Sequence, residues 1–136
     1  MNILGASSIT GSALDAEKIR VDITSQNIAN ANTTKGIDGK AYQRKIVAFE
    51  SILDAANGNG LQGVRVSEIF ADQSKGELIN NPQHPHADKD GNVQMPNVNM
   101  AFEMVDMMTA TRSYEANLAV VRNARQLANQ ALAIGR

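Results

Sequence analysis

Residues 99–134 read NMAFEMVDMMTATRSYEANLAVVRNARQLANQALAI, and this stretch decides the fold. One set of its positions steps by three and four residues in turn, which is the seam spacing of a long amphipathic helix. Only Thr111 and Arg125 interrupt the apolar character of this seam. Pro96 before it and Gly135 after it predict a helix of about 35 residues, roughly 50 Å long. The seam positions are Met104, Met107, Thr111, Tyr114, Leu118, Val121, Arg125, Ala128 and Leu132.

A second helix is predicted from about Ser8 to Ala31, and we expect it to end between Asn30 and Thr34. Thr10 is one of several plausible caps near its start. The apolar residues of this helix form two rows, and a helix that is apolar on two sides needs two neighbours. One row is Ile9, Ala13, Ala16, Ile19 and Ile23, and the other is Leu14, Val21 and Ile28.

Residues 35–99 lose the helical period and contain all three prolines and most of the glycines. Two strands are predicted, Tyr42 to Phe49 and Gly63 to Phe70, because β-branched and aromatic residues partly alternate there. Asp90-Gly91 is a hairpin signal that would join a short pair around residues 78–79 and 93–95. Such a small β-rich insert is not expected to be stable alone.

The fold class expected is mainly α with a small β-rich insert. Residues 1–34 form an N-terminal axial helix, 35–99 form the insert, and 100–136 form the long C-terminal helix. The terminal helices should pair as an antiparallel or splayed coiled coil, making one domain of 1–34 and 100–136. Alanine supplies 19 residues and aromatic side chains only 4% of the chain, so little apolar area can be buried within one molecule. We therefore expect the surplus surface of the longer helix to meet other chains.

Several functional classes are excluded by composition. A formal net charge of −1 gives no field for holding the chain on nucleic acid or an anionic membrane. The absence of cysteine excludes a disulfide framework and a thiolate metal site. The longest uninterrupted apolar runs have four residues, far short of the roughly 20 that span a bilayer. The first residues also lack the pattern of a cleaved secretory signal.

No catalytic, cofactor or metal site is predicted. The nearest catalytic candidates are Ser113-Tyr114 between Arg112 and Glu115, and the pair Glu103 and Asp106, but no nucleophile is placed on a strand-turn-helix and no phosphate-binding glycine loop exists. Residues 84–92 carry two histidines and two aspartates, yet a calcium loop aligned on Gly91 would lack its bidentate glutamate. A proline-punctuated turn before a hairpin is the better interpretation, and a calcium-dependent module is a distant alternative.

Two kinds of side chain on the long helix favour contacts between subunits. Arg125 lies on the apolar seam, where a charge needs a partner or must reach solvent, and Arg112 precedes it by thirteen residues. Methionines cluster around the start of the helix, and thioether side chains adapt to non-identical neighbours. Solvation of the arginines and core filling by the methionines are the competing explanations. The cluster comprises Met95, Met100, Met104, Met107 and Met108.

Several motifs resemble one protein family. Residues 25–34, SQNIANANTT, resemble the N-terminal signature of bacterial flagellar rod, hook and hook-associated axial proteins. Residues 84–99, HPHADKDGNVQMPNVN, together with EMVDMM at 103–108 and RSYEAN at 112–117, are similar to the proximal-rod members of that family. Asn92 stands where the family pattern has tyrosine, and Met100-Ala101 also departs from it.

The resemblance implies a structural subunit of the flagellar rod in the periplasm that transmits torque. It implies export by the flagellar type III apparatus without signal cleavage, and contacts with copies of itself, other rod proteins, the membrane-embedded MS ring and the export apparatus. The helices would form the inner coiled-coil layer of a helical tube. A soluble helical adaptor, or a type III secreted coiled-coil protein that binds one partner helix, remains the alternative.

Together, the pattern and the resemblance predict one set of subunit-interface residues. They are Leu14, Val21, Asn27, Ile28, Asn30, Asn32, Thr33, Met104, Met107, Met108, Arg112, Tyr114, Asn117, Leu118, Val121, Arg125, Ala128 and Leu132.

Overall fold

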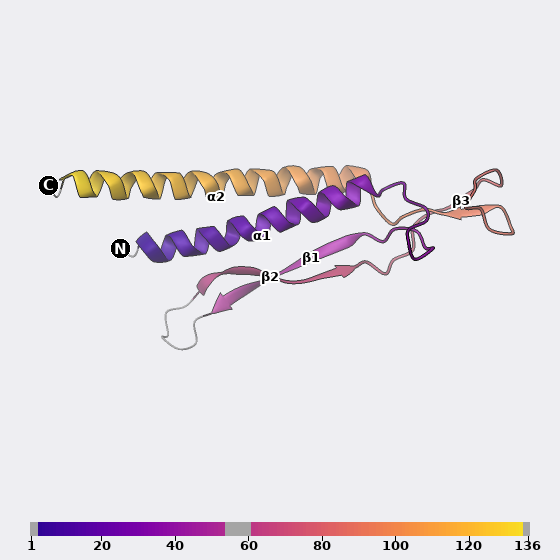
Figure 1. The fold of residues 1–136 in the computed structure, drawn as a ribbon, viewed down its shortest axis with the longest axis horizontal. Helices are drawn as coiled ribbons and strands as arrows, with labels where there is room; N and C mark the ends of the chain where they lie inside the picture. Colours follow the sequence, from indigo (N-terminus) through magenta and orange to yellow (C-terminus); the bar gives the residue numbers. More distant parts are fainter. Residues whose placement is uncertain (1–2, 54–60, 135–136) are drawn as a thin grey trace.

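The computed structural model describes residues 3–53 and 61–134. Two helices run side by side in opposite directions, and both chain ends lie at the same end of the molecule (Figure 1). Two small antiparallel hairpins occur between them in sequence, so the predicted class, mainly α with a small β insert, is confirmed. The elements are α1 (Ile3–Ala29), β1 (Lys45–Leu53), β2 (Leu61–Ala71), β3 (Leu78–Asn80), β4 (Asn92–Gln94) and α2 (Met100–Ile134).

The start of α2 agrees with the prediction to within a residue. The Asn99 side-chain oxygen accepts the backbone N–H groups of Ala101 at 3.0 Å and Phe102 at 3.2 Å, which is the geometry of an N-cap. Helix α1 begins earlier than predicted, at Ile3, so Thr10 lies inside the helix and is not its cap. The helix ends at Ala29, one residue before the expected range, where the mostly polar segment Asn30 to Thr34 begins.

The long hairpin pairs β1 with β2 from Lys45 opposite Ala71 to Leu53 opposite Leu61. Both strands extend further toward the turn than their alternation predicted, and the register shifts twice along them. Strand β3 pairs with β4 in a three-residue ladder, which confirms the predicted short pair, but residues 81–91 connect the strands, so Asp90-Gly91 ends a longer loop and is not a two-residue hairpin turn.

Helix α1 is the middle layer of the molecule. It packs against α2 on one side and against the β1–β2 hairpin on the other (Figure 1). The Ser12 hydroxyl accepts the backbone N–H of Val64 at 3.0 Å, and a Cβ at Gly63 would lie 2.5 Å from the same hydroxyl oxygen. The sequence predicted two neighbours for this helix, and α2 and the β1–β2 hairpin of the same chain supply them.

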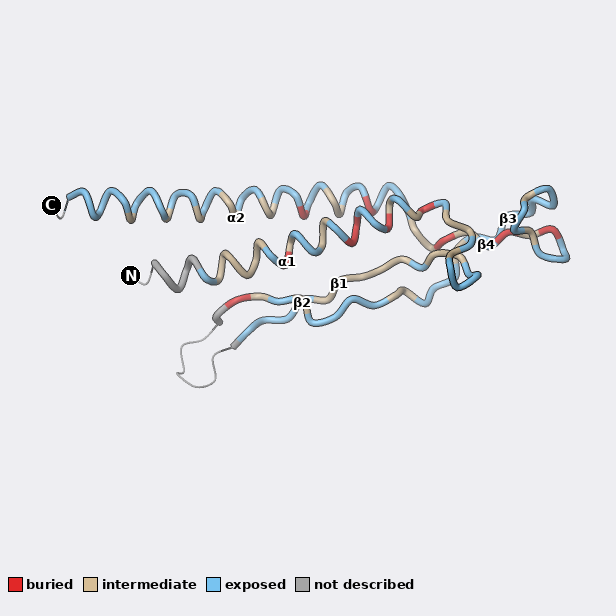
Figure 2. The backbone as a smooth tube through the Cα atoms, viewed as in Figure 1, coloured by how far each residue is buried: buried red, intermediate tan, exposed pale blue. Residues whose placement is uncertain are grey.

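Few apolar side chains are buried. Among the described residues they are Ala16, Ile23, Ala31, Val93 and Ala110, and three of these are alanines. Figure 2 shows burial gathered at the end where the helices meet the insert, whereas most of α2 is exposed. The expectation of a small private core is confirmed for this part of the chain.

The face that α2 turns toward α1 differs in part from the predicted seam. Glu103 and Asp106 of α2 bond to side chains of α1. After them, a row of buried and half-buried positions runs along α2 with steps of three or four residues. Alanine and asparagine occupy several of them, which a hydropathy pattern underrates although small side chains let helices approach closely. Met104, Thr111, Arg125 and Leu132 of the predicted seam are exposed instead. The observed row is Met107, Ala110, Tyr114, Asn117, Val121, Ala124 and Ala128.

Candidate assembly surfaces

A buried polar junction joins three elements where the helices meet the insert. Asn27, near the end of α1, donates its amide to the Glu103 carboxylate of α2 and to the backbone carbonyl of Lys45, each at 2.9 Å. Its side-chain oxygen accepts the Lys45 backbone N–H and the Tyr42 hydroxyl, also at 2.9 Å. Asn27 and Glu103 are each only 1% exposed, and all four bonding positions of the amide are placed against partners.

Charge in the junction is balanced by pairing. The Arg44 guanidinium pairs with the Glu103 carboxylate and also lies 3.5 Å from Asp106. Arg20 of α1 approaches the other Asp106 oxygen at 3.3 Å. Two arginines thus face two carboxylates, which is what lets a carboxylate be buried in so small a protein.

Burial raises the pKa of the Tyr42 phenol above its usual 10.0, and the negative charge of Glu103 adds to the effect. The neutral phenol is therefore the form that the junction favours, and in that form it can donate to Asn27.

A second asparagine fixes the insert to the start of α2. The Asn97 side-chain oxygen accepts the Arg44 backbone N–H at 2.7 Å, and its amide donates to the carbonyls of Asp72 and Ser74 at 3.0 Å. In the same turn the Asp72 carboxylate accepts the Ser74 backbone N–H, and this bond lowers the pKa of Asp72. These bonds connect the segment that leads into α2 with the residue just before β1 and with the segment just after β2.

The outward surface of α2 has the opposite character. Large apolar side chains stand in solvent along it, with Phe102 70%, Leu127 63% and Ile134 87% exposed. Val120, Leu127 and Ile134 are seven residues apart, so they lie on one side of the helix. We call these three residues, together with the exposed Val105 fifteen residues before Val120, the outer stripe of α2. A stripe with this period fits the groove of another helix.

The histidine-containing turn is held by its own side chains. One Asp88 oxygen accepts the backbone N–H groups of Asp90 at 2.9 Å and Asn92 at 2.8 Å, while His86 bonds the Thr34 hydroxyl through Nδ1. Within residues 3–53 and 61–134, no three potential metal-ligating side chains are grouped. These contacts fit the interpretation of residues 84–92 as a structural turn.

Comparison with known proteins identifies the family. The C-terminal model of the flagellar basal-body rod FlgEFG proteins matches residues 89–134, and the flagella basal body rod protein model matches residues 9–36. The flagellar basal-body rod protein FlgC of Salmonella typhimurium is 38% identical over 135 residues, covering 99% of both chains. The chain belongs to the FlgC family of flagellar basal-body rod proteins.

Distant bacteria carry similar FlgC proteins. That of Bacillus subtilis is 39% identical and covers 95% of both chains, and that of Agrobacterium fabrum is 44% identical and covers 90% of this chain and 87% of its own. These relatives are structural rod proteins, and this FlgC-family chain is a structural protein and not an enzyme. Neither described helix is long and apolar enough to cross a membrane.

The predicted interface residues of this FlgC-family chain fall into three groups. Asn27 is buried in the junction described above. Leu14, Val21, Ile28, Asn30, Thr33, Met107, Tyr114, Asn117, Leu118, Val121 and Ala128 are half-buried. Asn32, Met104, Met108, Arg112, Arg125 and Leu132 are exposed. The role of these residues between subunits stays a prediction. A second chain could contact the exposed group without disturbing the packing within this chain.

The junction is not predictable from the sequence pattern. Nothing in the pattern distinguishes Arg44, and Glu103 appears there only as a catalytic candidate and as part of the EMVDMM motif, because spacing along a helix cannot show that a carboxylate is buried. The one available signal was the asparagine-rich end of α1, where the family resemblance pointed to Asn27.

Proposed function

We propose that this protein is a structural subunit of the proximal flagellar rod and transmits torque across the periplasm. In this proposal the helical segments 1–34 and 100–136 act as one domain and pack as a coiled-coil layer of a helical tube, with the insert of residues 35–99 attached to it. Its neighbours are copies of itself, other rod proteins, the MS ring and the flagellar export apparatus, which also exports it.

The observation that carries the proposal is the excess of exposed surface. The chain exposes 9706 Å². A compact monomer of 14.6 kDa is expected to expose about 6,900 Å², so the excess is roughly 2,800 Å². Obligate interfaces bury about 2,000–5,000 Å² counted over both partners, or roughly 1,000–2,500 Å² from each, so the excess is large enough for at least one such interface. The excess surface includes the apolar outer stripe of α2. An apolar stripe along a helix packs well against a second helix, so we expect a helix of another subunit to bury it.

A shaft must resist shear, and a non-covalent tube gains stiffness from many small contacts per subunit. Heterologous contacts repeated along a screw axis build such a tube without closing into a ring. In this chain the helices would supply the lengthwise contacts, and the junction of Asn27, Arg44 and Glu103 would prevent the insert from turning independently of the helices. The junction would thus hold the insert to the helices that pack in the tube.

The experiment tests the outer stripe in living cells. Leu127→Glu combined with Val120→Glu should abolish swimming and leave basal bodies without a complete rod, because two charges would be buried between subunits. Both side chains are exposed in the single chain, so its helix content should not fall. The half-buried Leu118 and Val121 are poorer targets, since charge there would also disturb the α1–α2 pair.

Two matched variants control this experiment. Leu127→Met with Val120→Ile keeps the stripe apolar and should preserve swimming. Gln126→Glu, next to the stripe and also exposed, adds a charge without placing it on the stripe. Normal swimming by the double glutamate variant would contradict the proposal.

The adaptor alternative predicts a different behaviour in solution. A protein that binds one partner helix should sediment as a sharp dimer or a well-folded monomer with full helix content, whereas a rod subunit should be partly disordered until it assembles. Circular dichroism and sedimentation of the purified chain, with and without calcium, separate these cases and also test the calcium-dependent alternative.

A further inference from the structure

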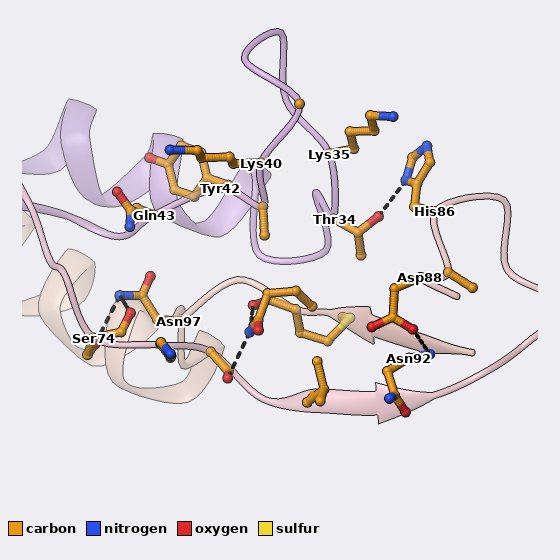
Figure 3. A pocket seen from close by; sticks show the side chains of 18 of the residues that line it. Thr34, Lys35, Lys40, Tyr42, Gln43, Ser74, His86, Asp88, Asn92 and Asn97 are labelled. Atoms are coloured by element: carbon orange, nitrogen blue, oxygen red, sulfur yellow. Dashed lines mark hydrogen bonds between the residues drawn. The ribbon is translucent and has the colours of Figure 1, made fainter. Parts of the chain in front are cut away.

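A cavity of about 660 Å³ lies at the insert end of the molecule, away from the outer stripe of α2. One wall is the loop of residues 34–43, and the other is formed by the β3–β4 hairpin and its turn (Figure 3). Lysines come to it from two segments, Lys35 and Lys40 from the loop and Lys75 from the chain before β3. No residue of the outer stripe of α2 lines this cavity.

Hydrogen bonds hold the walls in place. The Thr34 hydroxyl and His86 Nδ1 lie 2.8 Å apart and bridge the two walls at one end (Figure 3). Within the loop, Gly36 N–H donates to the Lys40 carbonyl at 2.7 Å, and Tyr42 N–H donates to the Thr33 carbonyl at 3.0 Å. The cavity is therefore built by the fold and does not depend on a ligand to form.

The backbone at the floor of the cavity is tightly packed. A Cβ at Gly76 would lie 2.0 Å from the Met95 carbonyl oxygen and 2.6 Å from the Pro96 carbonyl carbon. The segment before β3 thus lies directly on the segment that leads into α2, and Lys75 is carried on a fixed backbone.

Charge in the cavity is unbalanced. Within residues 3–53 and 61–134, none of the three lysine ammonium groups makes an ion pair, whereas Arg20, Arg44 and Arg65 all pair with carboxylates. The one acidic side chain in the lining is Asp88, and one of its oxygens already accepts two backbone N–H groups of its own turn. The lining therefore carries three positive side chains and one negative side chain, whereas Asp38, Glu77 and Asp90 are near it in the sequence but do not line it.

We propose that this cavity binds an acidic, extended peptide segment of a partner protein. The volume lies in the range of about 300–1,000 Å³ typical of ligand sites. The lining also contains the exposed amide of Gln43 and the apolar Leu78 and Met95, which suit a peptide backbone and its side-chain stems better than a small inorganic anion. The lysines provide the charge complementarity that selects carboxylates.

The test uses the full chain labelled with ¹⁵N at low salt and an acetylated, amidated tetraglutamate peptide as the probe. Backbone amide shifts should move in residues 34–43, 73–78 and 85–97 and stay in place along α2. The triple variant Lys35→Gln, Lys40→Gln, Lys75→Gln should weaken binding at least about tenfold, because three exposed ion pairs are lost. Lys89→Gln, a charge removal in the neighbouring turn outside the cavity, should leave binding unchanged.

Several results would overturn the proposal. They are equal shifts with tetraglutamine, equal weakening by Lys89→Gln, displacement of the peptide by an equal concentration of inorganic phosphate, and absence of dispersed signals from the cavity segments in the isolated chain. Because the cavity lies apart from the outer stripe of α2, Leu127→Glu should not affect this titration. Failure of the binding test therefore leaves the rod proposal standing, and failure of the swimming test leaves this one standing.

Discussion

Asn27 and Glu103 are 76 positions apart in the sequence, yet their side chains meet in a buried hydrogen bond of 2.9 Å. They are also the largest fully buried side chains of the described residues. In most small domains that place belongs to leucine or phenylalanine. Here the position of α1 along α2 is set by directional hydrogen bonds, with apolar packing too sparse to set it alone.

Replacing Asn27 with alanine should lower the free energy of unfolding by about 3 kcal/mol, since it leaves the Lys45 backbone groups and a Glu103 oxygen buried without their partner. Urea denaturation followed by circular dichroism measures the change. Asn30→Ala is the control, because the half-buried Asn30 makes local hydrogen bonds, with its amide donating to the Gln26 carbonyl and its oxygen accepting the Thr33 hydroxyl. Equal losses from the two variants would mean that the junction does not stabilise the fold.

Tyr42 predicts an alkaline limit to stability. Its pKa is raised in the folded state, so the stabilisation of the neutral phenol is complete below pH 10 and is lost as the pH rises through the folded-state pKa. The unfolding free energy should therefore fall above pH 10 in the natural chain and fall less in Tyr42→Phe. Urea denaturation at several pH values from 8 to 11 checks this, and parallel curves for the two proteins would contradict it.

The two causes of that shift can be separated. Tyr42 and Tyr114 are the only tyrosines, so a Tyr114→Phe background makes the phenolate absorbance report on Tyr42 alone. Adding Glu103→Gln should lower the pKa of Tyr42 only in part, because burial is the larger cause and remains. A return of the pKa to its ordinary value would mean that charge, and not burial, is responsible.

The elements of the fold could be predicted from the sequence because each has a local signal. The period of residues 99–134 predicts α2, and the hairpin signal Asp90-Gly91 predicts the β3–β4 pair, although the connection between the strands is longer than that signal implies. The prediction of the contact face of α2 was partly wrong. Ala110, Ala124 and Asn117 pack on that face because they are small or polar, and a hydropathy pattern does not take these properties into account. The junction was missed for a different reason. Burial of Glu103 depends on Arg44, and only the folded chain brings the two together.

Two glycines should respond to alanine with opposite signs. Gly11 lies inside α1 with nothing within 4 Å of its missing Cβ, so Gly11→Ala should stabilise the chain by about 0.5–1 kcal/mol through helix propensity. At Gly76 the same change would collide with the backbone of Met95 and Pro96, so the β3–β4 region should open. Hydrogen exchange should rise in residues 72–97 and change little along α1. Protection retained there would show that the backbone can yield.

Gly63 and Ser12 allow a test of how the long hairpin is attached to α1. An alanine Cβ at position 63 would lie 2.5 Å from the Ser12 hydroxyl oxygen, so Gly63→Ala should destabilise the chain by roughly 1–3 kcal/mol. Ser12→Ala alone should cost about 1 kcal/mol, because it removes the acceptor of the Val64 N–H.

The double variant decides whether the contact is direct. Once the Ser12 oxygen is absent, the nearest remaining atom to a Cβ at position 63 is the Ser12 Cβ at 3.2 Å, a contact that a small shift relieves. The two changes together should therefore cost less than the total of the separate losses, with a coupling of about 1 kcal/mol in a double-mutant cycle. Additive losses would mean that the hairpin is held to α1 by its apolar side chains and that the serine contact is incidental.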